Sequence, residues 1–205
     1  WGPGKNGCDD FEIDPQRLPN FSQSVKWLEA QNAKMVLWIA PFFQGQMETN
    51  ALKFGYHLAA QRPMRNNYPM VDFTNPKAKR YWQDGLAKFL KLGVAGYKLD
   101  RAEEDIPENG PYKVFDGRSI RGNRNAYPLM YIKAAWEVAK KHRGDDFALM
   151  PRAGYTDTAR YSVNWGGDIG GTQEGLRASI IAVQRSAVMG YSTWGSDTCG
   201  YNNQR

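Results

Sequence analysis

Charged side chains follow directly on an apolar segment near the middle of the chain. Residues 94–99 are apolar apart from Lys98, and Asp100 comes immediately after them, before the largely charged stretch 101–105. A lysine and an aspartate at the end of a buried strand cost free energy unless they are paired or used in chemistry. An ion-pair network at the mouth of a loop is the ordinary explanation. The other explanation is that Asp100 takes part in chemistry, because clustered charges in perturbed surroundings are common at functional sites.

A second carboxylate lies in a glycine-rich stretch further along the chain. Asp168 stands within residues 166–171, whose glycines let the backbone bend tightly and aim one carboxylate at a ligand. The same stretch is similar to a phosphate-binding loop, but its central aspartate would repel a phosphate. Arg152 lies between Asp100 and Asp168 in the sequence. Two carboxylates that flank one bond are the groups that hydrolyse glycosides.

Tryptophans stand at the ends of several predicted strands. Trp38, Trp165 and Trp194 each come at or near the end of a short apolar run. Aromatic faces stack on the C–H faces of sugar rings, so we expect these three residues to bind a carbohydrate substrate. For any single tryptophan, core packing is the ordinary explanation.

The inventory of histidines and cysteines excludes several other chemistries. His57 and His142 are far in sequence from any acidic cluster, so a Ser-His-Asp triad or a histidine-rich metal site is hard to build. Cys8 and Cys199 form no Cys-x-x-Cys motif, which argues against a structural zinc site. Free thiols are favoured, although a Cys8–Cys199 disulfide stays open. We expect no metal and no cofactor.

The charge balance and hydropathy exclude further classes of partner. The net charge is +6, but the basic residues are scattered, and the one tight run, residues 140–143, suits the end of a helix. A nucleic-acid-binding surface is therefore not expected. The longest apolar runs, such as residues 35–40, fall well short of the roughly 18 residues that a membrane helix needs. The sequence predicts neither a compartment nor an oligomeric state.

Strand and helix patterns alternate along the chain and must position these side chains. Periodicity and end signals predict helices over 22–32, 75–92, 125–142 and 172–189, with Asn75 and Thr172 as N-caps and Trp27 facing inward. Apolar runs predict strands over 35–40, 94–99, 147–150, 162–165 and 191–194. The intervening stretches 42–70 and 104–122 are expected to be loops.

The alternation of strands and helices favours an α/β fold with a parallel sheet. Each predicted strand ends in a polar or glycine-rich loop, which fits a (β/α)8 TIM barrel better than a Rossmann sheet, because functional residues gather at the C-terminal ends of barrel strands. A full barrel takes about 250 residues. The five predicted strands therefore suggest that residues 1–205 are part of one such barrel, incomplete, with a loop insertion near 42–70.

Six short segments resemble, in order, the motifs of glycoside hydrolase family 31. They are Val-Leu-Trp-Ile-Ala-Pro at 36–41, Val-Asp-Phe-Thr-Asn-Pro at 71–76, Gly-Tyr-Lys-Leu-Asp at 96–100, Pro-Arg-Ala-Gly at 151–154, Trp-Gly-Gly-Asp at 165–168 and Gly-Ser-Asp-Thr-Cys-Gly-Tyr at 195–201. The family contains retaining α-glucosidases and α-xylosidases. The resemblance spans nearly the whole chain and implies about strands 3 to 7 of the barrel.

The resemblance also implies roles for individual residues. Asp100 matches the catalytic nucleophile and Asp168 the general acid/base, while Arg152 matches an arginine that binds sugar hydroxyls. Lys98 and Trp38 match positions that line the same subsite. Glu103 and Asp197 are expected to support these groups from behind. A retaining mechanism then requires the two catalytic carboxyl groups to lie about 5–5.5 Å apart.

One departure from the family pattern and three alternatives remain open. Arg101 follows the nucleophile where a smaller or apolar residue is expected, so substrate preference is open. The alternatives are an α-galactosidase-like enzyme, a transglycosylating enzyme and a sugar-binding barrel without activity, although the last would tend to have lost a carboxylate. We also expect residues 1–205 to be inactive alone, since an open barrel exposes sheet edges.

Overall fold

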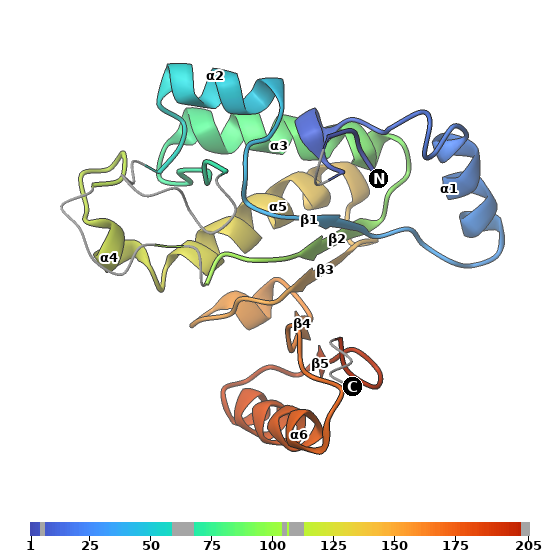
Figure 1. Ribbon diagram of the computed structural model, residues 1–205, viewed down its shortest axis with the longest axis vertical. Coiled ribbons are helices and arrows are strands. Elements are labelled where there is room, and N and C mark those ends of the chain that lie inside the picture. The colour runs from blue at the N-terminus through green and yellow to red at the C-terminus, as the bar shows by residue number, and fades with distance from the viewer. Residues whose placement is uncertain (5–6, 59–67, 104–105, 107–112, 202–205) are drawn as a thin grey trace.

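A computed structural model describes the whole chain except residues 5–6, 59–67, 104–105, 107–112 and 202–205. Three parallel strands lie in a sheet at the centre of the molecule, with helices α2, α3 and α5 on one side and a smaller part around α6 on the other (Figure 1). The helices are α1 (Phe21–Ala30), α2 (Gln46–Phe54), α3 (Pro76–Lys91), α4 (Ile120–Asn123), α5 (Tyr127–Arg143) and α6 (Gln173–Val188), with 3-10 helices at Asp9–Phe11 and Thr158–Arg160.

The strands follow one another in chain order. In the first sheet β1 (Leu37–Ile39) pairs with β2 (Gly96–Leu99), and β2 pairs with β3 (Ala148–Pro151), all parallel. β4 (Asn164–Trp165) pairs in parallel with β5 (Trp194–Gly195), and the Val163 amide donates to the Leu149 carbonyl at 3.0 Å, which joins the two sheets. Parallel strands linked by helices in sequence order are the arrangement of a TIM barrel. The described residues thus confirm the predicted α/β class and parallel order.

The core lies between the first sheet and the helices α3 and α5. Asn75 caps α3 by accepting hydrogen bonds from the backbone amides of Lys77 and Ala78, as predicted, and Pro76 begins the helix. Trp82 of α3 and Tyr131 of α5 are fully buried with ring centroids 5.5 Å apart. The two helices therefore hold the three strands in place through aromatic packing.

A glycine permits the close approach of β2 and β3. Gly96 has φ +147°, and a Cβ at this position would lie 1.9 Å from the Ala148 carbonyl oxygen. Only glycine fits such a contact with backbone atoms. Gly96 therefore fixes the start of the strand that ends at Asp100.

Two stretches predicted as loops contain helices. Residues 46–54 form α2, which is capped by Asp10: its carboxylate accepts from the backbone amides of Gln46 and Met47 at 2.9 and 2.6 Å. The cap comes from a distant part of the sequence, and α2 buries only Met47 and Ala51. The sequence around residues 46–54 therefore shows neither an adjacent N-cap residue nor a clear apolar face. Residues 120–123 likewise form the single turn α4. Other parts of both stretches, 59–67 and 104–112 except 106, lie outside the described residues.

The part around α6 is far less buried than the core. Thr172 caps α6 as predicted, with its hydroxyl accepting from the Gly175 amide, but no side chain of α6 is buried. Several of its apolar side chains are more than a third exposed: Leu176, Ile180, Ile181 and Val188.

Trp27 of α1 is 64% exposed, so the prediction that it faces inward is wrong.

The described residues carry no helix that is long and apolar enough to span a membrane. In the same residues no three His, Cys, Asp or Glu side chains gather as a metal site would require. Both cysteines are free thiols, as favoured by the sequence.

Candidate active site

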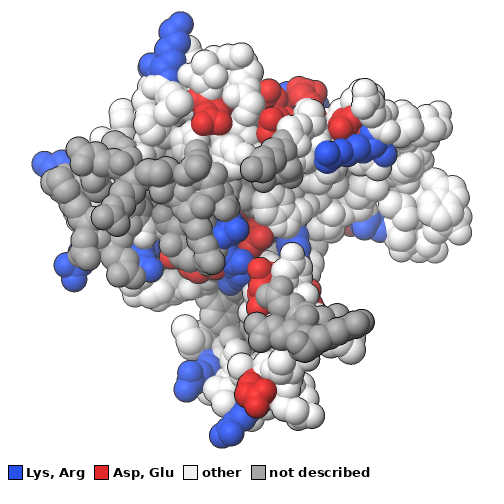
Figure 2. Space-filling model, viewed as in Figure 1, with Lys and Arg blue, Asp and Glu red and all other residues white. Residues whose placement is uncertain are grey.

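The C-terminal ends of the strands open onto one cavity of about 400 Å³. Figure 2 shows basic and acidic side chains next to each other near the middle of the face, where the part with α2, α3 and α5 meets the part with α6. The residues that line the cavity belong to strands β1, β2 and β4, to the loops that follow β1, β2, β4 and β5, and to the segment that precedes Met70: Trp38, Phe42, Gln44, Tyr68, Lys98, Asp100, Arg101, Trp165, Asp168 and Tyr201.

Asp100 is held by three hydrogen-bond donors. Trp38 Nε1 donates to Oδ2 at 2.8 Å, while the Arg101 amide and Arg152 Nη1 reach Oδ1 at 2.8 and 3.0 Å. The Asp100 side chain is 13% exposed. The strand register explains this contact, because Trp38 of β1 lies beside Lys98 of β2, one position before the strand ends. The carboxylate is therefore fixed in one orientation at the floor of the cavity.

Arg152 joins three carboxylates. Its Nε lies 2.5 Å from Glu103 Oε1, and its Nη1 lies 3.0 Å from Asp100 Oδ1 and 3.9 Å from Asp168 Oδ2. Because one nitrogen contacts an oxygen of each, these oxygens of Asp100 and Asp168 are at most about 7 Å apart. The structure thus brings the two predicted catalytic carboxylates to one cavity and places Glu103 behind the arginine that bridges them.

The glycines before Asp168 make room for neighbouring side chains. A Cβ on Gly166 would lie 2.6 Å from the Trp194 ring, and one on Gly167, whose φ is +80°, would lie 3.0 Å from Arg152 Cδ. Gly167 therefore leaves room for Arg152, and Gly166 leaves room for Trp194, next to the loop that carries Asp168. The Asp168 side chain is 41% exposed and lines the cavity.

Lys98 and Trp165 form a cation–π pair on the wall of the cavity. The Lys98 ammonium lies 3.6 Å from the centroid of the Trp165 ring. Trp165 is 4% exposed, and its Nε1 has no hydrogen-bond partner in the described part of the chain. The indole N–H is thus a buried donor at the edge of a cavity lined by carboxylates.

Two predicted site residues lie elsewhere. Trp194 does not line the cavity; its ring lies next to Gly166, in the loop that carries Asp168. The sequence had led us to expect a substrate contact for Trp194. Asp197 lines a second cavity of about 760 Å³ next to the start of α6 rather than the one with Asp100.

Several lining residues were not expected from the sequence. Gln44, Phe42 and Tyr68 fall within the stretch 42–70, which has no strand or helix pattern near them, and Tyr201 is the last residue of the motif at 195–201. The signal that could have identified Gln44 is its position three residues after Pro41, at the end of the apolar run of β1.

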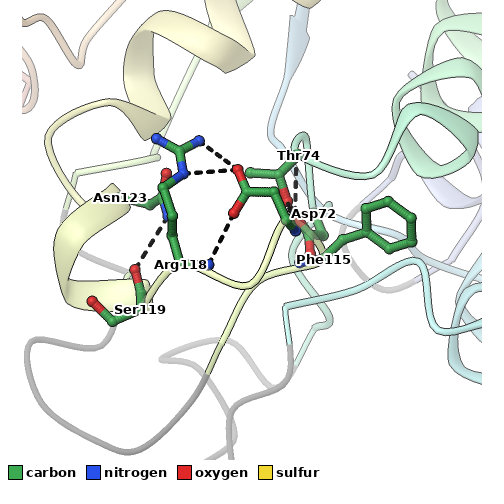
Figure 3. Close-up of polar contacts among 7 residues, drawn as sticks. Asp72, Thr74, Phe115, Arg118, Ser119 and Asn123 are labelled. Carbon is green, nitrogen blue, oxygen red and sulfur yellow. Dashed lines mark hydrogen bonds and ion pairs between the residues drawn. The ribbon is translucent and has the colours of Figure 1, made fainter.

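Asp72, in the motif at residues 71–76, does not line the cavity and has a structural role. Its carboxylate accepts from the Thr74 amide and hydroxyl at 3.0 and 2.6 Å and from the Phe115 amide at 2.8 Å (Figure 3). Asp72 is 3% exposed. It therefore ties the loop that leads to α4 to the segment before α3, and a buried carboxylate of this kind is satisfied by donors rather than by substrate.

Tyr131 links the ends of β1 and β2 next to Asp100 through its hydroxyl group. Its hydroxyl donates to the Ile39 and Asp100 carbonyls at 3.2 and 3.3 Å. Burial, and after it the negative charge of Asp100, raises the pKa of Tyr131 well above its ordinary value. The phenol stays protonated and serves as a fixed donor that links the ends of β1 and β2.

Comparison with known proteins identifies the family of this chain. Residues 2–205 match the model of the glycosyl hydrolases family 31 TIM-barrel domain. An alpha-xylosidase of Emericella nidulans is 28% identical over 98% of this chain, and a 1,3-alpha-isomaltosidase of Kribbella flavida is 26% identical over 95% of it. A family 31 sulfoquinovosidase from E. rectale has a similar fold, with a TM-score of 0.85 and 22% identity over 97% of this chain.

These relatives are much longer than the chain. The match covers 27% of the alpha-xylosidase, 29% of the isomaltosidase and 32% of the sulfoquinovosidase chain. The family model nevertheless spans nearly all of the present residues, including both carboxylates of the cavity. The chain therefore belongs to glycosyl hydrolase family 31, and residues 2–205 lie in the TIM-barrel domain of that family.

Proposed function

We propose that this chain carries the catalytic centre of a retaining α-glycoside hydrolase of the α-glucosidase or α-xylosidase type. The observation that carries the proposal is the position of Arg152 Nη1, 3.0 Å from Asp100 and 3.9 Å from Asp168 at one cavity. Paired carboxylates at such a distance are the groups that double displacement needs. Their upper limit of about 7 Å includes the separation of about 5–5.5 Å in retaining enzymes and leaves out most of the range of inverting ones.

Asp100 is the nucleophile and Asp168 the general acid in the first step. An oxygen of Asp100 attacks the anomeric carbon, the bond to the leaving oxygen breaks, and the proton of Asp168 moves to that oxygen. The three donors on Asp100 hold its carboxylate in a fixed orientation for attack. The greater exposure of Asp168 suits a group that exchanges protons with the leaving group and with water.

Asp168 acts as the base in the second step. It removes a proton from a water molecule, whose oxygen attacks the anomeric carbon and releases Asp100. Two successive inversions leave the α configuration unchanged. The chain's own residues supply every group that these steps use.

The remaining wall residues bind the sugar. Trp38 offers an aromatic surface to the sugar ring, while Trp165, which is buried, holds Lys98 at the cavity wall through the cation–π contact. Lys98 and Arg152 provide cationic donors on the same wall. Glu103 acts through Arg152, which it holds by an ion pair.

The proposal is tested in the enzyme that carries this chain, at its natural full length, with α-linked disaccharides and aryl α-glycosides. Asp100→Asn is expected to lower kcat about 10⁴-fold on every substrate. Asp168→Asn is expected to lower it about 10³-fold on disaccharides but far less on aryl glycosides with acidic leaving groups, because these need little proton donation. Proton NMR of the first product should show the α anomer.

Asp145→Asn is a matched control, since Asp145 is a surface carboxylate whose side chain is 92% exposed. It should leave the kinetics of every substrate unchanged. Turnover near that of the parent enzyme in Asp100→Asn, or a β anomer as first product, would overturn the proposal.

A further inference from the structure

Gln44 is a buried polar residue in the cavity to which neither the sequence nor the catalytic mechanism gives a role. It is 6% exposed and lines the same cavity as Trp38 and Asp100. It stands on the loop that follows β1, whereas Asp168 stands on the loop that follows β4, and both residues line this cavity. Gln44 therefore lies where a sugar in the cavity could be contacted by a group that the catalytic steps do not use.

The backbone around Gln44 is fixed by two other segments. The Gln44 carbonyl accepts from the Asp10 amide at 3.3 Å, and the Phe43 amide donates to the Pro69 carbonyl at 2.9 Å. Gly45 has φ +69°, and a Cβ there would lie 2.4 Å from the Asp10 carboxylate, so the next residue can only be glycine. The position of the Gln44 side chain is thus determined by packing rather than by chance exposure on a loop.

The orientation of the Gln44 amide is set by Cys8. The Cys8 thiol donates to Gln44 Oε1, with a sulfur–oxygen distance of 2.8 Å. Burial raises the pKa of Cys8 to about 11, so the thiol keeps its proton and remains a donor at neutral pH. The amide oxygen is thereby occupied on the side away from the cavity. Within the described residues, Gln44 Nε2 donates no hydrogen bond to another residue.

We infer that Gln44 Nε2 donates a hydrogen bond to a hydroxyl of the sugar that Asp100 attacks, and that Cys8 is the positioning residue that aims it. A sugar hydroxyl is an acceptor of the right kind at this wall, and a buried amide N–H gains most when it is paired. This inference rests on the proposed function, because it takes the cavity to hold a glycoside.

The test compares Gln44→Leu with the parent enzyme on an aryl α-glycoside and on its 2-, 3-, 4- and 6-deoxy analogues. Gln44→Leu should lower kcat/KM about tenfold on the complete sugar. For the one analogue that lacks the contacted hydroxyl, kcat/KM of the parent and of Gln44→Leu should differ less than twofold, because this analogue cannot form the hydrogen bond with either enzyme. Gln46→Leu is the matched control, since Gln46 is exposed and does not line the cavity.

The role of Cys8 is tested by rescue. Cys8→Ala should reproduce most of the loss in kcat/KM with the same dependence on the deoxy position, whereas Cys8→Ser, which keeps a donor, should restore it. A merely structural role would instead lower the melting temperature and reduce kcat/KM equally for all analogues.

Equal losses on every analogue, or no loss in Gln44→Leu, would overturn the inference. These outcomes are separable from failure of the proposed function, which shows itself as retained turnover in Asp100→Asn. An enzyme in which Asp100→Asn is inactive while Gln44→Leu is indistinguishable from the parent would keep the mechanism and remove Gln44 from it.

Discussion

Arg152 links the acidic side chains of the site to one another. This guanidinium is 12% exposed and contacts Asp100, Asp168 and Glu103 at once. Its five N–H donors in a rigid planar fork can engage carboxylates on several sides at fixed angles, whereas a lysine ammonium is a single point charge. The orientation of Arg152 is set from one side by Glu103 and made possible on the other by the absence of a side chain at Gly167.

Glu103→Gln tests this dependence. The change removes the negative charge that faces Arg152, whose guanidinium can then turn toward Asp100, so we expect kcat to fall about tenfold to a hundredfold with KM changed less than threefold. Glu137→Gln is the control, because Glu137 pairs with Lys79 at the contact of α3 and α5, away from the cavity. Steady-state kinetics of both variants provide the measurement, and an unchanged kcat in Glu103→Gln would remove its supporting role.

The two cysteines should differ in reactivity. The raised pKa of Cys8, about 11, leaves roughly one thiol in a thousand ionised at pH 8, and only the thiolate is alkylated. Cys199 is exposed. Iodoacetamide at pH 8 should therefore modify Cys199 and spare Cys8 in the folded protein, as read by peptide mass spectrometry. Labelling of Cys8 should rise as pH approaches 11 and should be complete after unfolding; equal labelling at pH 8 would contradict this.

Among the secondary structure elements, β2 approaches its neighbour β3 closely at Gly96. Gly96→Ala would place a methyl group 1.9 Å from the Ala148 carbonyl, at a φ that alanine rarely adopts. Since backbone must move, we expect a loss of about 2–3 kcal/mol in the free energy of unfolding. Gly195→Ala, at a strand position with open space around it, should change stability by less than about 0.5 kcal/mol. Urea unfolding of both variants gives the comparison.

Elements were predictable from the sequence where their signals are local. α3 and α6 carry their own caps, Asn75 and Thr172, and the strands β1 and β2 are short apolar runs. α2 was missed because Asp10 caps it from 36 residues away. The meeting of Asp100, Asp168 and Arg152 at one cavity was expected from motifs at strand ends and from the family resemblance. Gln44 and the true place of Trp194 depend on contacts between separate loops, which no local pattern encodes.

At the scale of the whole molecule, buried tyrosines link the stability of the core to pH. Burial raises the pKa of Tyr97 and of Tyr131 above the ordinary value near 10, and their hydroxyls donate to the Leu86 and Ile39 carbonyls. Below pH 10 both states keep the proton and stability is unaffected. Above it, the unfolded chain ionises while the folded protein does not, so the free energy of unfolding falls.

Each such tyrosine should lower the free energy of unfolding by about 1.4 kcal/mol per pH unit, over the range between its pKa in the unfolded chain and its pKa in the folded protein. Tyr97→Phe should therefore flatten the alkaline decline by that amount. The measurement is urea unfolding at pH 9–11.5 for the parent and the variant. Tyr155→Phe, at an exposed tyrosine, is the control and should leave the slope unchanged; equal slopes in parent and Tyr97→Phe would contradict the assignment.

The unequal burial on the two sides of the cavity has a consequence for motion. Asp100 ends a strand paired on both edges and covered by α3 and α5, whereas Asp168 leads into α6, where no side chain is buried. Segments with few buried apolar contacts open at a lower free energy and exchange their amide protons sooner. In this chain, deuterium uptake should therefore begin around residues 166–188 while β2 is still protected. The distance between the Asp100 and Asp168 carboxylates then follows the fluctuations of the segment that carries Asp168, and on warming this distance should spread before the core melts.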